Sequence, residues 1–273
     1  SAAEDSGGGR NLDYRHWWLR DATITLEALL RTGYTQEALD WREWLGRAIA
    51  GDPSDVQIMY GVAGERRLPE WEADWLPGYE GAQPVRIGNA AHAQLQLDVY
   101  GELMDAFHQS RVTKLKLDDG TWDLECKVLE HLAEVWDQPD HGIWERRGDG
   151  AHYVSSRVMT WVAFDRAIKS AEQFGFEAPL AQWRKLRDTI HRDVCEKGFD
   201  RSINAFVESY GSRLLDASIL LLPSVGFLPV SYPRVRGTLE AIEKYMMRDG
   251  FGLRHDPRPV TERTGQRQPL WGA

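Results

Sequence analysis

Eight segments in which apolar residues recur every three or four positions constrain the fold of this chain more than any other feature. That spacing places apolar side chains on one face of an α-helix, and no part of the sequence has the pattern of a strong strand. The predicted helical segments are 21–33, 38–49, 89–107, 124–135, 158–171, 180–190, 214–222 and 233–246. Asp21 is expected to cap the first helix, and Gly33 to end it. Pro223 is expected to end the seventh helix, and Pro233 to lie in the first turn of the eighth. The chain is therefore predicted to be all-α.

Three long connections, rich in Gly, Pro and Trp, interrupt these helices at 51–88, 138–153 and 198–213. Helical bundles normally use short connections. Several long aromatic loops on a helical scaffold therefore indicate a functional face. A helical repeat with decorated loops remains open as the alternative.

Composition excludes several classes of function. The 33 basic and 42 acidic residues give a net charge of −9, whereas a nucleic-acid-binding protein needs a positive face. The longest apolar run, near 219–222, stops at Pro223, far short of the roughly 20 residues of a membrane span. Nucleic acid and membrane are therefore not expected as partners.

The ends of the sequence and its cysteines bear on processing and compartment. Residues 1–10 read as a flexible linker, and the chain starts with Ser1 in place of Met, as if cut from something longer. Two cysteines do not make a disulfide framework, and no signal peptide is recognisable. A cytoplasmic location is therefore expected.

The chain is rich in aromatic side chains, with 12 tryptophans and 9 tyrosines. Such rings stack on the apolar faces of sugars while a polar edge stays hydrated. A large core could also hold many of them, so composition alone favours carbohydrate binding only weakly.

The segment Tyr14–Asp21 concentrates polar and aromatic groups directly before a helix. Arg20 offers a rigid fork of donors beside the Asp21 carboxylate. One interpretation is a capped helix with a surface ion pair. The other is a pair that binds neighbouring sugar hydroxyls, with Trp18 and Tyr14 as walls.

A second cluster, Asp140-His141-Gly142-Ile143-Trp144-Glu145, could supply a general acid. Trp144 can hold the neighbouring carboxyl against an apolar surface, which favours its protonated form. Alternatively, Glu145 pairs with Arg146 or Arg147 at the surface. Spacing alone favours the surface pair.

Other catalytic patterns are missing from the sequence. The eight histidines show no His-Glu-x-x-His spacing, and there is neither a Gly-x-Ser-x-Gly elbow nor a glycine-rich phosphate loop. The sequence therefore predicts no metal and no cofactor.

Seven blocks of residues are spread along the chain. The blocks are Tyr14-Arg15-x-x-Trp18-Leu19-Arg20-Asp21-Ala22, Gln57-x-Met59-Tyr60-Gly61, Pro84-Val85-Arg86-Ile87-Gly88-Asn89-Ala90-Ala91, Gly142-Ile143-Trp144-Glu145, Trp161-Val162-Ala163-x-Asp165-Arg166, Asp200-Arg201-Ser202-Ile203-Asn204 and Asp216-Ala217-Ser218. They occur in the order found in glycoside hydrolase family 15, which the chain resembles from about residue 11 to about residue 257. The likeness is greatest to the bacterial glucoamylase-or-trehalase branch.

The resemblance implies an (α/α)6 toroid with the sugar pocket at one end, and an inverting exo-acting hydrolase that releases glucose from α-glucans or trehalose. Residues 11–257 would form a partial catalytic domain with about eight of the twelve helices, followed by a divergent tail at 258–273. By the resemblance, Glu145 is the general acid. Arg20 and Asp21 hold the terminal glucose, and Trp18, Tyr14 and Trp144 line its subsite. Arg86 and Arg254 match positions near the pocket, and Tyr79 is expected to add an aromatic wall.

The general base of the family is expected well beyond Arg254-His255-Asp256-Pro257. The stretch Thr261–Trp271 does not resemble the family's continuation, and nothing marks its one carboxylate, Glu262, as the base. A fragment, a frameshift or a degenerate relative would each explain this, and each predicts impaired hydrolysis.

Two other functions remain open: a noncatalytic carbohydrate-binding relative, and a sugar epimerase with catalytic histidines facing the pocket. The sequence leaves open whether trehalose, maltose or a longer α-glucan is the substrate. It also leaves open the oligomeric state and any dependence on phosphate or magnesium.

Overall fold

Two layers of α-helices dominate the computed structural model, which describes residues 11–49, 51–113 and 120–258. The helices are α1 (Leu19–Thr32), α2 (Thr35–Ala48), α3 (Asp98–Val112), α4 (Gly120–Val135), α5 (Val154–Phe174), α6 (Leu180–Lys197), α7 (Leu221–Ser224) and α8 (Pro233–Met246). The predicted linker 1–10 and residues 259–273 of the predicted tail, with Glu262, lie outside the described residues.

Four pairs of antiparallel strands, each strand two residues long, lie in or next to the connections between the helices. They are β1 (Trp17–Trp18) with β2 (Met59–Tyr60), β3 (Trp71–Glu72) with β4 (Arg86–Ile87), β5 (Phe199–Asp200) with β6 (Ala205–Phe206), and β7 (Met247–Arg248) with β8 (Phe251–Gly252). The 3₁₀ turns are η1 (Pro53–Asp55), η2 (Tyr79–Gly81), η3 (Ala90–Ala93) and η4 (Ala217–Leu220). The strands are too short to form a layer, so the all-α prediction is confirmed.

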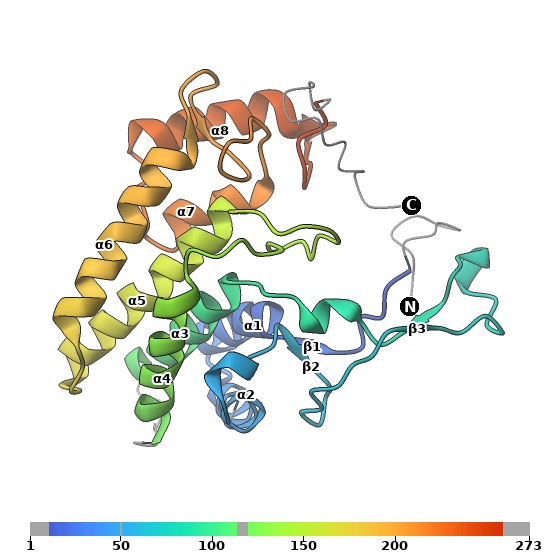
Figure 1. Ribbon diagram of the computed structural model, residues 1–273, viewed down its shortest axis with the longest axis horizontal. Coiled ribbons are helices and arrows are strands. Elements are labelled where there is room, and N and C mark those ends of the chain that lie inside the picture. The colour runs from blue at the N-terminus through green and yellow to red at the C-terminus, as the bar shows by residue number, and fades with distance from the viewer. Residues whose placement is uncertain (1–10, 50, 114–119, 259–273) are drawn as a thin grey trace.

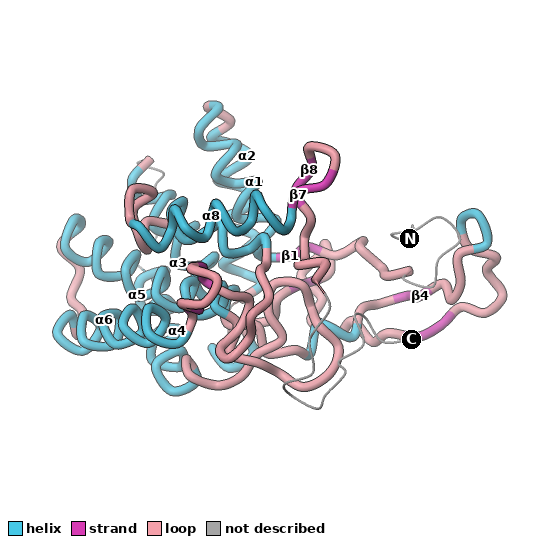
Figure 2. The backbone as a smooth tube through the Cα atoms, turned by 90° about the horizontal axis from the view of Figure 1, so that it is seen from above, coloured by secondary structure: helices cyan, strands magenta, loops and turns pink. Residues whose placement is uncertain are grey.

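The helices alternate between an inner and an outer layer along the chain (Figures 1 and 2). α1 packs on α3 and α3 packs on α5, while α2 packs on α1 and α6 packs on α5. α5 is buried along residues 154–168, on all sides, as expected of an inner helix covered by others. This succession of paired helices has the architecture expected for part of an α/α toroid.

α3 and α5 approach each other closely at Gly101. A Cβ atom at this position would lie 2.2 Å from the backbone oxygen of Met159 on α5. The missing side chain therefore lets two inner helices touch backbone to backbone, and this contact fixes the spacing of the inner layer.

In three of the predicted helical segments, a tertiary contact makes the helix begin at another residue than expected. α1 starts at Leu19 and Trp18 is its N-cap, so Asp21 lies in the first turn and is not the cap. The reason is that β1 pairs with β2 and the Leu19 N–H donates to the Ile58 carbonyl at 2.9 Å, which leads the chain into the helix earlier.

The third helix starts at Asp98, not near Asn89, because Asn89 caps the short η3 turn and the Leu97 N–H donates to Asp140. The segment predicted as the seventh helix starts with η4, since Leu215 pairs with the chain near Asp256. Pro223 lies inside the first turn of α7, where its missing N–H is tolerated.

The connection between α2 and α3 projects from the helices as an arm that carries β3 and β4 (Figure 1). Trp71 and Trp75 stack on each other there, 5.5 Å between ring centroids, and both are exposed. The prediction of long aromatic loops is correct, although the arm holds its aromatic rings away from the helical core.

No helix of the described part of the chain is both long enough and apolar enough to cross a lipid bilayer.

Replacing Gly101 with alanine is expected to lower the free energy of unfolding by about 1–3 kcal/mol, because the added methyl group has no space between α3 and α5. Gly46 of α2 provides the control. A Cβ at Gly46 meets nothing within 4 Å, so Gly46→Ala is expected to stabilise the protein by about 0.5–1 kcal/mol. Urea unfolding of both variants measures the two effects, and equal stabilities would contradict the close helix contact.

Candidate active site

A cavity of about 520 Å³ lies where the stretch before α1, the first turns of α1 and the 138–153 loop meet. This volume is in the usual range for small-molecule sites. Its lining is Leu12, Tyr14, His16, Trp17, Trp18, Arg20, Asp21, Ala22, Thr25, Ile143, Trp144, Glu145 and Arg254. Residues more than 200 positions apart in the sequence therefore share one pocket.

Glu145 is held between two groups from the start of α1. The Trp18 indole N–H donates to Glu145 Oε1, and Nη2 of Arg20 lies 3.8 Å from the same oxygen. The Glu145 side chain is 13% exposed. The carboxyl therefore faces the pocket while almost all of its surface is out of solvent.

Burial raises the pKa of Glu145 above the usual value for a glutamate, and the negative charges of Asp98 and Asp21 act in the same direction. The hydrogen bond from Trp18 and the charge of Arg20 oppose this effect. The net result favours a protonated carboxyl at a higher pH than in solvent, which is the property of a general acid.

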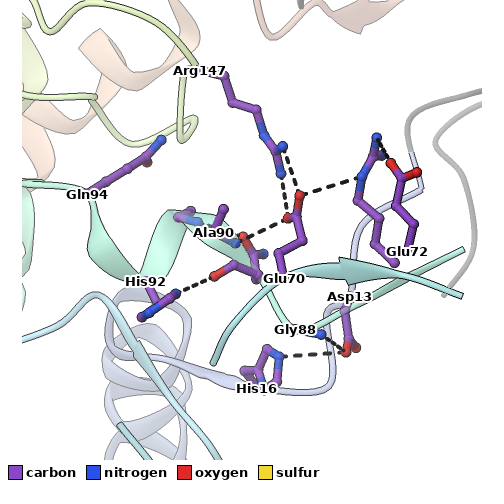
Figure 3. Close-up of polar contacts among 12 residues, drawn as sticks. Asp13, His16, Glu70, Glu72, Gly88, Ala90, His92, Gln94 and Arg147 are labelled. Atoms are coloured by element: carbon purple, nitrogen blue, oxygen red, sulfur yellow. Dashed lines mark hydrogen bonds and ion pairs between the residues drawn. The ribbon is translucent and has the colours of Figure 1, made fainter. Parts of the chain in front are cut away.

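The surface pairing of Glu145 that spacing alone favours is wrong. Arg146 forms its ion pair with Glu208. Arg147 reaches Glu70, to whose two carboxylate oxygens its Nη1 and Nη2 donate (Figure 3). Both neighbouring arginines therefore form ion pairs with other carboxylates, and the Glu145 side chain points toward the start of α1.

A tight turn sets the direction of the Glu145 side chain. The Glu145 N–H donates to the Gly142 carbonyl at 3.1 Å, and Glu145 itself has φ +55°. Gly142 also has positive φ and lies against the Tyr153 ring, which a Cβ would approach to 2.8 Å. A non-glycine residue at positive φ stores strain that the surrounding contacts must offset.

Arg20 is itself fixed by α3. Its Nη1 lies 2.9 Å from Asp98 Oδ2 and 3.5 Å from Gln96 Oε1. Both acceptors are buried. Sequence reasoning missed them, because they lie 76 and 78 positions from Arg20 and only helix packing brings them together.

The stretch before α1 is anchored through Asp13. Its carboxylate accepts the Gly88 N–H at 3.0 Å, and His16 Nε2 lies 3.7 Å from the same carboxylate (Figure 3). His16 lines the pocket, so a histidine does face it, which sequence reasoning did not identify. Contacts with Arg15 and Gly88 keep the pKa of Asp13 well below its usual range. The charged carboxylate therefore holds the stretch before α1 in place at the pocket.

The structure brings together seven of the nine predicted site residues: Tyr14, Trp18, Arg20, Asp21, Trp144, Glu145 and Arg254 all line the cavity. Tyr79 and Arg86 are not among the lining residues. Tyr79 is exposed on the arm, and Arg86 pairs with Glu70 and Glu72. Both residues belong to the arm, and the structure does not bring either of them into the lining of this cavity.

Trp144 lines the pocket and is held by Asp216, which does not line the pocket itself. Trp144 donates its indole N–H to both carboxylate oxygens of Asp216, each at 2.9 Å. The Arg254 guanidinium lies 4.7 Å from the centre of the Trp144 ring. The sequence contained Asp216 in one of its seven blocks but gave no sign of this role.

Glu208, Asp216 and His255 form the one group in the described ranges whose side chains could ligate a metal, with candidate ligand atoms within 4.8 Å of one another. Arg146 already pairs with Glu208, and Trp144 already donates to Asp216. The carboxylates of the group therefore serve as hydrogen-bond acceptors in this structure.

The arrangement has the parts needed to protonate an oxygen atom of a bound ligand. A buried carboxyl supplies the proton, and Arg20 and Asp21 beside it can bind hydroxyl groups. Aromatic rings from Trp18 and Trp144 provide flat apolar walls of the kind that stack on sugars.

Comparison with known proteins gives a consistent family match. A model of glycosyl hydrolases family 15 matches residues 1–262. The chain is 40% identical over 258 residues to a trehalase of Mycobacterium tuberculosis and 40% identical over 251 residues to a trehalase of Thermoplasma volcanium. These alignments cover 93% and 92% of this chain but 38% and 40% of the relatives, so the chain spans about two fifths of their length.

Solved structures share the fold. A glycosidase variant in complex with glucose superposes with a TM-score of 0.68 at 18% identity, over 88% of this chain and 64% of that one. A glucoamylase from Saccharomycopsis fibuligera gives a TM-score of 0.61 at 14% identity, over 86% of this chain and 55% of the other. The helical architecture is therefore that of known glycosidases.

Replacing Trp18 with phenylalanine is expected to raise the pKa of Glu145 further, because the indole hydrogen bond to Glu145 stabilises the ionised carboxylate. A ¹³C NMR titration of the glutamate carboxyl groups measures the pKa, with the Glu145 signal assigned by its loss in Glu145→Gln. Trp44→Phe is the control, since the Trp44 indole donates to the Val62 carbonyl. An unchanged or lowered pKa in Trp18→Phe would refute the contact.

Proposed function

The chain belongs to glycosyl hydrolase family 15, and we propose that its pocket binds the terminal glucose of an α-glucoside whose glycosidic oxygen Glu145 protonates. The observation that carries this proposal is the placement of Glu145. Its carboxyl is buried, has a raised pKa and lies in one cavity with Arg20 and Asp21. Residues 11–257 are accordingly part of a catalytic domain.

Arg20 and Asp21 bind adjacent hydroxyl groups of the glucose. The guanidinium fork of Arg20 is held rigid by Asp98, so it loses little conformational freedom when it donates to a sugar. Trp18, Trp144 and Tyr14 enclose the ring, and Arg254 supports the Trp144 wall.

Inverting hydrolysis needs a second carboxylate, about 6.5–9.5 Å from the acid, which activates the attacking water. Among the described residues that line the pocket, Asp21 is the one carboxylate besides Glu145. Asp21 is committed to sugar binding in this proposal, so we assign the general base to none of the described residues. This chain by itself is accordingly expected to bind α-glucosides but to hydrolyse them poorly.

Trehalose and maltose are the first substrates to test, because the two relatives at 40% identity carry the name trehalase and a glucoamylase shares the fold. A noncatalytic carbohydrate-binding protein is the second candidate, and the missing base among the described pocket residues is the observation that favours it.

Arg20→Lys is expected to weaken binding of trehalose or maltose about tenfold, because lysine keeps the charge beside Asp98 but lacks the planar fork. Isothermal titration calorimetry measures the affinity. Arg31→Lys on the same helix is the matched control, since the Arg31 side chain is 77% exposed and pairs with Glu27. Equal affinities for the two variants would contradict the role of Arg20.

Glucose release from trehalose and maltose by the purified chain is expected to be far below that of a complete family member. Glu145→Gln is expected to abolish the remaining turnover and to leave affinity unchanged, because glutamine cannot donate the proton. A glucose assay and calorimetry measure the two quantities. Full turnover by the parent chain would overturn the proposed impairment, and turnover retained in Glu145→Gln would overturn the assignment of the acid.

A further inference from the structure

Asp216 is a buried carboxylate for which the proposed reaction has no direct use. It is 2% exposed, begins the η4 turn as its N-cap, and does not line the sugar pocket. An isolated buried charge is costly, so its contacts indicate what it does.

Four groups form hydrogen bonds with the Asp216 carboxylate. The Trp144 indole N–H reaches both oxygens at 2.9 Å, the Ser218 N–H donates at 2.8 Å, the Ser218 hydroxyl also donates, and His255 Nδ1 lies at 3.2 Å. Burial opposes ionisation, yet these hydrogen bonds together hold the pKa of Asp216 below its ordinary value. The carboxylate is therefore ionised, and its bond to the indole is charge-assisted.

Trp144 and Glu145 are consecutive residues of one tight turn whose side chains are anchored on opposite sides. The Trp144 indole is bound to Asp216, while the Glu145 carboxyl is bound to Trp18. Glu145 has φ +55°, a conformation that persists only when surrounding contacts fix it. Release of either anchor would let the turn relax.

The backbone at Asp216 also pairs with the last described segment of the chain. Asp216 forms a β-bridge with His255, and the Ala217 N–H donates to the Arg254 carbonyl at 3.1 Å. Arg254 in turn lies over the Trp144 ring. Asp216 therefore supports Trp144 both through the indole N–H and through the residue that packs on its face.

We infer that Asp216 is a positioning residue: by holding the Trp144 indole, it keeps the Glu145 carboxyl buried against Trp18 and Arg20. The inference rests on the proposed function, since it concerns the group that we propose as the acid. Asp216 acts through Trp144 and does not touch the sugar.

The Trp18 indole N–H provides a spectroscopic report of the Glu145 carboxyl, to which it is hydrogen-bonded. In ¹⁵N-labelled protein its resonance is identified by its loss in Trp18→Phe, and its pH titration follows ionisation of Glu145. In Asp216→Asn the turn is released and the Glu145 carboxyl moves away from Trp18, so the pH-dependent shift of this resonance is expected to shrink or vanish. Affinity for trehalose or maltose is expected to fall about tenfold.

Trp144→Phe removes the indole donor but keeps Asp216 with Ser218, so it is expected to reduce the pH-dependent shift of the Trp18 resonance as well. The double variant should show no further change, because both substitutions break the same link. Trp144→Phe also tests the positioning role if Asp216→Asn folds poorly.

Asp200→Asn is the matched control. Asp200 Oδ1 accepts from the Ser202 N–H at 2.7 Å and from its hydroxyl at 2.6 Å, the same local geometry as Asp216 with Ser218, and Asp200 does not line the pocket. It is expected to leave both the Trp18 titration and the affinity unchanged.

A Trp18 titration of unchanged amplitude in both Asp216→Asn and Trp144→Phe would overturn the positioning role. So would an amplitude that falls equally in Asp200→Asn. Failure of the proposed function has a different signature: the parent chain would then bind neither sugar in calorimetry, while the Trp18 titration would still report whether Asp216 holds Glu145 in place.

Discussion

The site depends on one contact, in which the Glu145 carboxyl is held between the Trp18 indole and the Arg20 guanidinium. Trp18 and Arg20 belong to the start of α1, and Glu145 belongs to the loop between α4 and α5. They meet only if α1, α3 and α5 stack in the observed order. The packing of the inner layer therefore determines both the place of the carboxyl and its burial, and burial is what makes it a suitable acid.

The site is preorganised by two buried carboxylates that do not line the pocket themselves. Asp98 of α3 holds Arg20, and Asp216 at the start of η4 holds Trp144. Each is buried, so each would be costly without its partner. A ligand entering the pocket meets side chains that are already oriented, and little conformational entropy is lost on binding.

Sequence reasoning predicted the features that depend on local pattern. Helical periodicity predicted eight helices, and Gly33 and Pro233 lie at the predicted helix ends because both act through backbone geometry. Ordered family blocks identified Arg20 and Glu145 as neighbours in space. The starts of α1 and α3 could not be predicted in this way, since pairing with distant segments decides them. The same holds for Asp98, which is linked to the site by helix packing alone.

A crystal structure of the chain in complex with trehalose or maltose tests the central claim most directly. The account predicts a glucose ring in the 520 Å³ cavity, with Arg20 and Asp21 on its hydroxyl groups and the Glu145 carboxyl within hydrogen-bond distance of the glycosidic oxygen. A sugar bound elsewhere on the molecule, or a Glu145 side chain turned away from the glycosidic oxygen, would contradict it.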